Sequence, residues 1–504
     1  MKLPRRQFLK ASAGSVALLA ATGCDKWPRE LRVLFPPKET GPFQAPAQAD
    51  IDPITHVLNR AAFGPRAGDY ERIKKLALIP SEAAATYLEQ QLKPESIEDD
   101  AGEHAVHKFE TLAEPLGELF EYQEDLLQHE LMRATLARAV WSERQLYEVM
   151  VQFWSDHFNI DPSKGDCKWL KVADDREVIR PHALGKFSDL LRASALSPAM
   201  LWYLDGRVNR RAEMEHKPNE NYARELLELH TLGVHGGYTQ KDVMELARCL
   251  TGWTVRSKDK PPYFQIGKVE FQPKLHDFGE KEVLGNRIPA TPETLPVSAR
   301  EQRGRAEIDR VLDLVTRHPA TARHISAKLC RHFIADDPPA SAVDALAATF
   351  TRTTGDIRAV LQTLFATEEF RAQRGNKFKR PFTFIASALR ATDAQTDSGL
   401  DIITYLRRMG HAPFNYPTPD GYPEQAAPWM GTLLWRWNFA LALSQNRIPG
   451  TRIEFDKLRA NAGGDSGLIA HFLGRQPTPD EVQAYHGSGD GLALILASPA
   501  FQKC

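Results

Sequence analysis

The residues best placed to do chemistry form a polar stripe on one predicted helix, residues 219–233. At about 3.6 residues per turn, Asn221, Glu225 and Glu228 share one face of this helix. Leucines occupy most of the remaining circumference, which predicts a largely buried helix. Buried carboxylates must be paired, protonated or bound to a metal, so the stripe predicts a catalytic site in which Glu225 and Glu228 act as acid or base groups. In this site Asn221 and Arg224 would orient the substrate.

The same stripe also fits a purely structural role. In that interpretation, ion pairs with nearby arginines neutralise the two glutamates, and the candidates are Arg176, Arg180 and Arg224. Arg224 is the best placed of them, because it lies one helical turn before Glu228. The sequence leaves both interpretations open.

Histidines suggest a second kind of chemistry. His157 shares a helical stripe with apolar side chains and is expected to point inward, and His230 lies on the apolar face of the helix 219–233. Imidazole and carboxylate are common ligands of divalent transition metals. The predicted metal ligands are His157, His276, Asp277 and Glu225. Inward histidines are also ordinary core residues, and the spacing matches no named metal motif.

Motifs for other cofactors are absent. The sequence contains no P-loop, no GxSxG elbow, no CxxCH haem attachment and no GxGxxG fingerprint. Nucleotide and c-type haem cofactors are therefore not expected, and a divalent metal is the cofactor that the residues suggest. Four tryptophans near the polar positions fit either a buried core or an aromatic-lined sugar or peptide groove: Trp154, Trp169, Trp202 and Trp253.

The composition of the whole chain restricts the classes of protein. The 504 residues carry 64 lysines and arginines against 65 aspartates and glutamates, and this balance gives no reason to expect nucleic-acid binding. The content of 42% hydrophobic and 26% charged residues is typical of a globular protein. The lack of a long apolar run excludes a multi-span membrane protein. Five scattered cysteines without a CxxC pair indicate neither a zinc knuckle nor a disulfide scaffold.

The elements that must position these residues are mostly helices. Helical periodicity dominates residues 51–255 and returns over 303–395. A smaller C-terminal portion, 396–504, is also predicted to be helical. Residues 256–302 are rich in proline, and alternating runs within 264–271 predict a loop-rich insert with one short hairpin that forms a lid. The predicted fold is mainly α, a large multi-helix globular body with this insert. The clearest N-terminal helices are expected near 82–93, 104–158, 174–195, 219–233 and 239–253.

Residues 1–24 are typical of an export signal. A basic start without acids precedes a weakly apolar run that is too short to cross a bilayer stably. Arg5 and Arg6, followed by Gln-Phe-Leu-Lys, resemble a twin-arginine signal, and Cys24 closes a segment that resembles a lipobox. We therefore expect export by the twin-arginine machinery and a lipid anchor at Cys24. A proline-rich tether, 25–50, would then hold the body on the periplasmic side of the inner membrane, and without the lipid the protein would be soluble in the periplasm.

Several strings together resemble one bacterial family, the "domain of unknown function 1800" family, from about Ile54 to the C-terminus. The strings are Trp154-Ser-Asp-His157-Phe158, Pro198 to Asp205, Pro218 to Gly233, Gly237 to Val243, Leu250-Thr-Gly-Trp253, His276-Asp-Phe-Gly279 and Gly421-Tyr422-Pro423. The resemblance implies an exported protein whose chemistry is unassigned. Relatives often lie beside genes for another exported family, number 1501, which resembles sulfatases and phosphatases. A protein of that family is therefore an expected partner.

Two functions follow as hypotheses. The first is a periplasmic metal-assisted hydrolase with a His and Glu site, covered by the insert 256–302. The second is a non-catalytic binding or assembly protein that serves an exported partner of the 1501 type, in which the polar stripe is structural. The sequence alone does not establish that the protein is an enzyme.

Overall fold

A computed structural model describes residues 32–34, 36, 40–213, 217–259 and 262–504. The predicted export signal, with Arg5, Arg6 and Cys24, lies outside these residues. None of the helices in the described ranges is both long and apolar enough to span a bilayer.

Helices form most of the described chain, and the strands make only two-stranded sheets, which confirms the mainly α prediction. The helices of the first half are α4 (Pro53–Arg60), α5 (Asp69–Lys74), α6 (Pro80–Gln91), α7 (Asp100–Val106), α8 (Glu124–Trp141), α9 (Gln145–His157), α10 (Cys167–Asp174), the π-helix η5 (Asp175–Ile179), α11 (Arg180–His182), α12 (Phe187–Ala195), α13 (Pro198–Tyr203), α14 (Asn221–Glu225), the π-helix η7 (Leu226–His230) and α15 (Gln240–Cys249).

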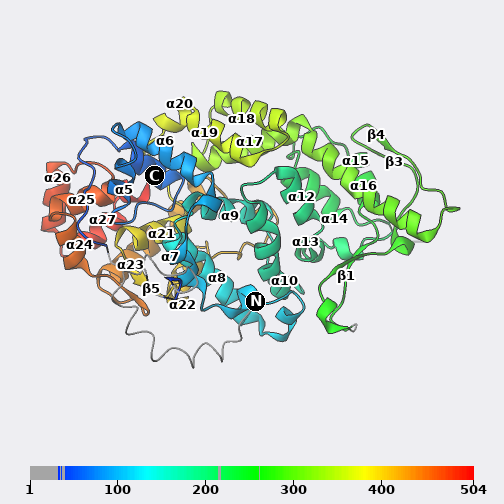
Figure 1. Cartoon of the computed structure of the whole chain (residues 1–504), viewed down its shortest axis with the longest axis horizontal. Helices are drawn as coiled ribbons and strands as arrows, with labels where there is room; N and C mark the ends of the chain where they lie inside the picture. The colour runs from blue at the N-terminus through cyan, green and yellow to red at the C-terminus, as the bar shows by residue number, and fades with distance from the viewer. Residues whose placement is uncertain (1–31, 35, 37–39, 214–216, 260–261) are drawn as a thin grey trace.

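The second half begins with strands and continues with helices (Figure 1). The strands are β1 (Trp253–Val255), β2 (Val269–Phe271), β3 (Lys281–Val283), β4 (Asn286–Ile288), β5 (Gln395–Thr396) and β6 (Thr451–Arg452). The helices are α16 (Val297–Arg317), α17 (Pro319–Phe333), α18 (Ala340–Thr353), α19 (Ile357–Ala366), α20 (Glu368–Ala372), α21 (Pro381–Ala391), α22 (Leu400–Arg408), the 3-10 helix η10 (Ala427–Thr432), α23 (Leu433–Ser444), α24 (Phe455–Asn461), α25 (Asp465–Leu473), α26 (Pro479–Gly487), α27 (Gly491–Ala497) and α28 (Pro499–Gln502).

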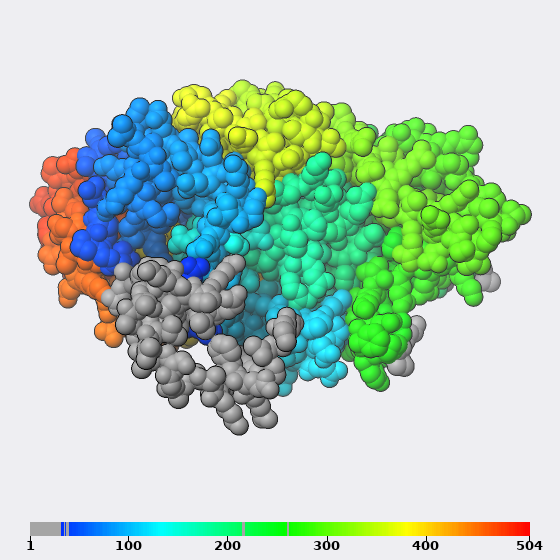
Figure 2. Space-filling model, in the orientation of Figure 1, coloured from blue at the N-terminus to red at the C-terminus, as the bar shows by residue number. Residues whose placement is uncertain are grey.

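The two ends of the described chain lie together at one end of an elongated molecule. Figure 1 shows α24–α27 beside α5, and α15, α16, β3 and β4 at the opposite end. In Figure 2 the blue N-terminal and orange C-terminal segments share one continuous surface. Buried apolar side chains from Phe43 to Phe501 form one contiguous cluster. The boundaries predicted at 255, 302 and 395 therefore mark local changes of structure around a shared core.

Several predicted helices are shorter or less regular than the periodicity indicates. The segment 104–158 is divided among α7, α8 and α9, and a break at 142–144 separates the last two helices. In the segment 219–233, only Asn221–Glu225 is α-helical, and a π-helix continues to His230. A π-helix rotates less per residue than an α-helix, so the face of each side chain after Glu225 departs from the predicted projection.

The insert contains two hairpins, where the sequence predicts one. β1 pairs with β2 in antiparallel register, and residues within Tyr263–Gln265, expected to be extended, form a 3-10 turn instead. The second hairpin joins β3 to β4 through Leu284 and Gly285. Both turn residues have positive φ, 50° and 72°, as a type I′ turn requires.

The tether predicted over 25–50 is wrong for its described second half. Phe43 is buried against the C-terminal helices, and its backbone N–H donates to the carbonyl of Asn461 at 2.9 Å. The carbonyl of Gln48 accepts from the N–H of Gln476 at 2.7 Å. An aromatic anchor and backbone hydrogen bonds hold residues 40–50 on the body, because burying Phe43 removes a large apolar surface from water.

Four cysteines lie in the described part of the chain, and all are buried as free thiols: Cys167, Cys249, Cys330 and Cys504.

Candidate functional site

Four segments that are distant in sequence meet at the C-terminal end of α9. They are α9 itself, the π-helix η7, α17 and the loop 412–424. Three of these segments contain strings quoted above as family motifs, namely Trp154 to Phe158, Pro218 to Gly233 and Gly421 to Pro423. We call this meeting point the junction site.

The loop 412–424 lies against α9 because a glycine permits the close approach. Gly421 has a φ of 73°, and a Cβ at this position would lie 1.9 Å from the carbonyl oxygen of Asp156. The Nδ2 of Asn159 donates to the carbonyls of Tyr416 at 2.9 Å and Thr418 at 2.8 Å. The loop is therefore fixed to the end of α9 by backbone conformation and by side-chain donors.

One stripe of α17 carries three basic side chains at successive turns: His324, Lys328 and His332. The Nε2 of His324 donates to the carbonyl of Leu229 on η7 at 3.2 Å. The Nδ1 of His332 lies 2.8 Å from Oε1 of Glu424 in the loop. The two histidines thus connect α17 to two of the other segments, with Lys328 between them.

Lys328 is half-buried and lacks a partner. Its ammonium group makes no hydrogen bond or ion pair with any residue in the described part of the chain. Burial lowers the pKa of Lys328 to about 8, although the negative charges of Glu424, Asp156 and Asp420 act in the opposite direction. A lysine with this pKa is a cation at neutral pH that releases its proton more easily than an ordinary lysine.

The carboxyl groups near Lys328 differ in the direction of their pKa shifts. Burial raises the pKa of Asp156 to about 6, even though NH1 of Arg380 donates to its Oδ2 at 2.8 Å. Burial also acts to raise the pKa of Glu424, but the charge of Arg380 and the contact with His332 bring it well below its usual range. The second terminal nitrogen of Arg380, NH2, is buried without a partner. The surroundings therefore raise the pKa of Asp156 and lower that of Glu424, although both carboxyl groups lie near Arg380.

The predicted polar stripe lies beside this centre but is more exposed than predicted. Asn221 is exposed, and Glu225 and Glu228 are half-buried. Burial raises the pKa of Glu225, and the charges of Glu228 and Asp420 raise it further. The charge of Asp420 thus acts on both Glu225 and Lys328, which places these three residues around one region. The two carboxylates of the stripe are therefore shielded only in part, and Asn221 at its start is open to solvent.

The arginines near the stripe have separate partners. Arg224 lies 3.6 Å from Glu228 and also donates to Gln240 at 2.9 Å, as the structural interpretation predicts for Arg224. Arg176 instead pairs with Glu177, and Arg180 pairs with Glu148 and Asp175. Glu225 has no arginine partner of its own within the described residues.

His157 is a core residue. Only 1% of it is exposed, and its Nε2 donates to the carbonyl of His230 at 3.1 Å. Burial lowers the pKa of His157 well below its usual value and that of His230 to about 3, so both rings are neutral. The Nδ1 of His157 and the Nε2 of His230 are buried and have no hydrogen-bond partner among the described residues.

The other two predicted metal ligands belong to a separate network in the insert. The Nδ1 of His276 donates to the carbonyl of Thr251 at 2.8 Å, and its Nε2 lies 3.2 Å from Glu307. Asp277 accepts from Arg248 at 2.8 Å. No group of three or more His, Cys, Asp or Glu side chains in the described ranges is arranged to hold a metal. The structure therefore does not bring the four predicted ligands together.

The tryptophans mainly support the core interpretation. Trp154 is fully buried and donates to the carbonyl of Ala183 at 3.0 Å, and Trp253 is 5% exposed. Trp169 stacks on Phe120, and Trp202 lies under the guanidinium of Arg207 at 3.6 Å. All four rings are occupied by protein contacts or buried.

Sequence reasoning missed five residues of the junction site: Asp156, Lys328, Arg380, Asp420 and Glu424. Signals for some of them were present. Asp156 immediately precedes His157, and Glu424 follows the Gly421 to Pro423 string. Lys328 is spaced four residues from a histidine on either side, which places all three on one helical face.

The chain is a mainly α protein in which carboxylates, histidines and the half-buried Lys328 meet at the junction site. The chain matches the family described as "Protein of unknown function (DUF1800)" over residues 56–503, and it belongs to that family. No curated protein and no solved structure matches the chain.

Proposed function

We propose that the protein is an exported hydrolase whose catalytic centre is the junction site. The observation that carries this proposal is Lys328, a half-buried cation without a partner that faces three carboxylates. Structural lysines in protein interiors are paired, because an unpaired buried charge is costly. Perturbed titratable groups of this kind concentrate at catalytic sites.

The proposed reaction is the hydrolysis of an acyl bond. Glu225, whose raised pKa makes it a stronger base than an ordinary glutamate, takes a proton from a water molecule. The water oxygen bonds to the acyl carbon, and the ammonium of Lys328 stabilises the negative charge on the acyl oxygen. The bond to the leaving group then breaks, and the carboxyl of Glu225 gives its proton to that group. The products are a carboxylic acid and an alcohol or amine.

The titration of Lys328 tests the proposal without a known substrate. Reaction of the folded protein with an amine-selective reagent across pH 6 to 11, read by peptide mass spectrometry, gives an apparent pKa for each lysine. We expect about 8 for Lys328, well below the value of about 10.4 for a lysine side chain in a model peptide. An ordinary value for Lys328 would remove the basis of the proposal.

Activity provides the second test. A panel of nitrophenyl esters and amino-acid anilides should yield a substrate whose hydrolysis falls at least a hundredfold in Glu225→Gln and in Lys328→Met. The pH profile should be bell-shaped, because Glu225 must be ionised and Lys328 protonated. Full activity in both variants would contradict the assignment of these residues.

Metal assistance is a separate proposal, and the separate networks of His157 and Glu225 on one side and His276 and Asp277 on the other do not support one shared metal. No step above depends on it, since these residues have separate partners. Elemental analysis of protein purified from the periplasm measures it directly. Less than about a tenth of an equivalent of any divalent transition metal would remove it.

A second function, binding to an exported partner of the 1501 type, is supported by an apolar surface at the start of α23. The large apolar side chains Met430, Leu433, Leu434 and Trp437 are 39–67% exposed. Exposed apolar clusters mark protein contacts in many proteins. Leu434→Glu should abolish co-purification of a 1501-type protein from the same cells. Retention of that protein by the variant would exclude this surface as the contact.

The exported location is also a proposal, supported by the resemblance of residues 1–24 to a twin-arginine lipoprotein signal. Cell fractionation should find the intact chain in the inner membrane. Cys24→Ser should release it into the periplasm, and Arg5→Lys with Arg6→Lys should retain it in the cytoplasm.

A further inference from the structure

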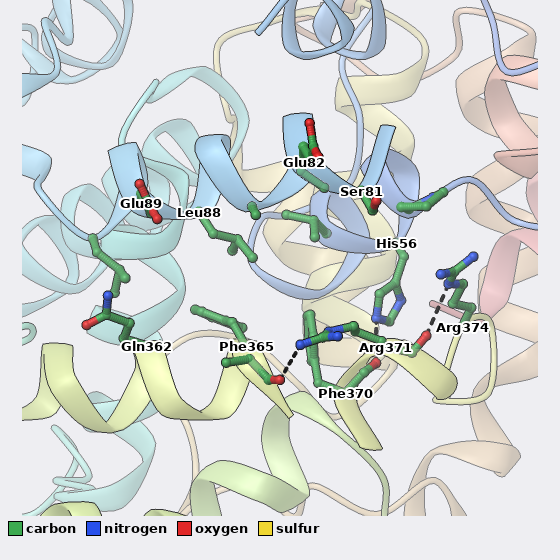
Figure 3. A pocket seen from close by; sticks show the side chains of 16 residues that line it. His56, Ser81, Glu82, Leu88, Glu89, Gln362, Phe365, Phe370, Arg371 and Arg374 are labelled. Atoms are coloured by element: carbon green, nitrogen blue, oxygen red, sulfur yellow. Dashed lines mark hydrogen bonds between the residues drawn. The ribbon is translucent and has the colours of Figure 1, made fainter. Parts of the chain in front are cut away.

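A cavity that contains none of the junction residues lies elsewhere in the helical body. It separates α4 and α6 on one side from α19 and α20 on the other (Figure 3). Its volume is about 430 Å³, which is within the range of sites that enclose a single small ligand.

The walls of the cavity are mostly apolar. They consist of Val57 from α4, Leu88 and Leu92 from the α6 segment, and Phe365 and Phe370 from α19 and α20. Each of these side chains is less than 9% exposed, so the cavity lies between packed surfaces that already belong to the core. Such walls favour a ligand with a hydrocarbon or aromatic body.

One end of the cavity carries two positive charges with little neutralisation. Arg374 donates to the carbonyls of Arg371 at 3.1 Å and Ile51 at 3.3 Å, and it makes no ion pair with a described residue. Arg371 donates to the carbonyl of Ala366, and its nearest carboxylate, on the exposed Glu368, is 3.8 Å away. Figure 3 shows both arginines on the α20 side, while Glu82 points away from them on α6. The two guanidinium groups can therefore bind an anion.

One ring nitrogen of His56 is a hydrogen-bond acceptor to which no described group donates. His56 is 3% exposed and lines the cavity, and its Nε2 lies 2.8 Å from the carbonyl oxygen of Phe370. Because a carbonyl only accepts, Nε2 carries the hydrogen and Nδ1 is the acceptor. Nδ1 is buried and has no partner in the described chain. Burial lowers the pKa of His56 to about 3, so the ring is neutral and adds no charge.

We propose that this cavity binds one amphipathic anion, a molecule with an apolar body and a single carboxylate. The body would lie between Leu88 and Phe365, and the carboxylate would pair with Arg371 and Arg374. A hydroxyl or amide N–H near the carboxylate would supply the donor that Nδ1 of His56 lacks. The site is distinct from the junction site, and its ligand is independent of the proposed hydrolase activity.

Titration calorimetry of the full chain with dodecanoate, below its micelle concentration, tests the proposal. We expect one molecule bound per chain. Dodecyltrimethylammonium has the same tail and the opposite charge, so it should bind at least tenfold more weakly. Equal binding of the two probes would show that the arginines do not select the ligand and would overturn the proposal, as would the absence of dodecanoate binding.

Variants locate the site. Ala85→Trp fills the cavity from an exposed position on α6 and should abolish binding, with an unchanged thermal transition as the check of folding. Arg374→Gln should weaken binding about tenfold, which corresponds to about 1.4 kcal/mol. The matched control is Arg310→Gln, an exposed arginine of α16 that does not line the cavity, and it should leave affinity unchanged. Dodecanoate bound equally by Ala85→Trp would place the ligand elsewhere.

His56→Gln separates the role of Nδ1 from the structural role of Nε2. The glutamine amide keeps an N–H donor for the carbonyl of Phe370, and its oxygen is an acceptor at a different position from Nδ1 of the ring. A 2-hydroxydodecanoate ligand should bind several-fold more tightly than dodecanoate to the parent chain, and this advantage should disappear in the variant. Persistence of the advantage would exclude His56 from the site.

Discussion

Two lysines beside carboxylates behave differently in the insert and in the junction site. Lys281 is fully buried in the insert, and its ammonium donates to Oε2 of Glu307 at 2.7 Å and to the carbonyls of Asp277 and Gly279. Lys328 is half-buried in the junction site and donates to none of the described groups around it. Both lysines lie near acidic side chains and histidines, but only the ammonium of Lys281 has a hydrogen-bond acceptor for each of its three protons.

The difference distinguishes a lysine that holds the fold from one that is available for chemistry. The three acceptors around Lys281 offset the cost of its burial and hold β3 against α16. The environment of Lys328 lowers its pKa and leaves its protons free for a substrate. Spacing in the sequence does not separate these two cases, whereas the number of acceptors within reach does.

The largest effect should come from Lys281→Met. The substitution leaves Glu307 as a buried carboxylate without its cation, so the free energy of unfolding should fall by about 3–5 kcal/mol. Denaturant titration measures it. Lys241→Met, which removes an exposed pair with Glu282, is the control and should leave stability nearly unchanged. A small effect at Lys281 would remove the contrast with Lys328.

Gly421→Ala should disturb the junction site. The new Cβ would meet the carbonyl oxygen of Asp156, and φ is positive, so we expect a loss of about 2–3 kcal/mol of stability and a loss of the proposed hydrolase activity. Gly410→Ala is the matched control, because it has a φ of 71° but nothing within 4 Å of its Cβ. Its loss should be only about 1 kcal/mol. Equal losses would show that backbone strain, and not contact with α9, determines the effect.

Acid should weaken the junction site through its neutral histidines. Burial lowers the pKa of His230 to about 3 and that of His324 to about 4. Below pH 6.5 the unfolded chain binds protons that the folded chain does not, so stability is complete above this pH and is lost as pH falls toward 4. His230 alone should cost about 1.4 kcal/mol at pH 5.5. Denaturant titrations at pH 7.5 and 5.5 should differ by that much less in His230→Leu than in the parent.

Lys328→Met should have the smallest effect on stability. The substitution removes the cost of burying the charge together with its attraction to Asp156 and Glu424, so stability should change by less than about 1 kcal/mol. The same denaturant titration measures it. A loss above about 3 kcal/mol would show that Lys328, like Lys281, mainly stabilises the fold.

Local sequence patterns predicted many elements because their causes are local. The capping box of Thr239 and Asp242 starts α15 where the pattern predicts, and proline begins α17 and α21 within the predicted helical range 303–395. The π-helix at Leu226–His230 was not predictable from an α-helical repeat. It changes the faces of the residues after Glu225, and its cause lies in packing against α9 and α17.

The candidate site was predicted in part. Glu225 lies beside the junction site as expected, and His157 and His230 point inward as expected. The core surrounds both rings. The Nε2 of His157 therefore bonds to a backbone carbonyl, and the Nδ1 of His157 and the Nε2 of His230 have no partner among the described residues. His276 and Asp277 lie in another network, since the insert folds onto α15 and α16.

The sequence by itself determined the mainly α fold, the membership of the family and the motifs that carry the site. Helical periodicity and caps are local properties, and they act wherever the segment lies. Only the tertiary structure decided which charges have partners. Lys328, Asp156 and Glu424 are distant in sequence, and their pKa values depend on burial and on neighbours that folding brings together.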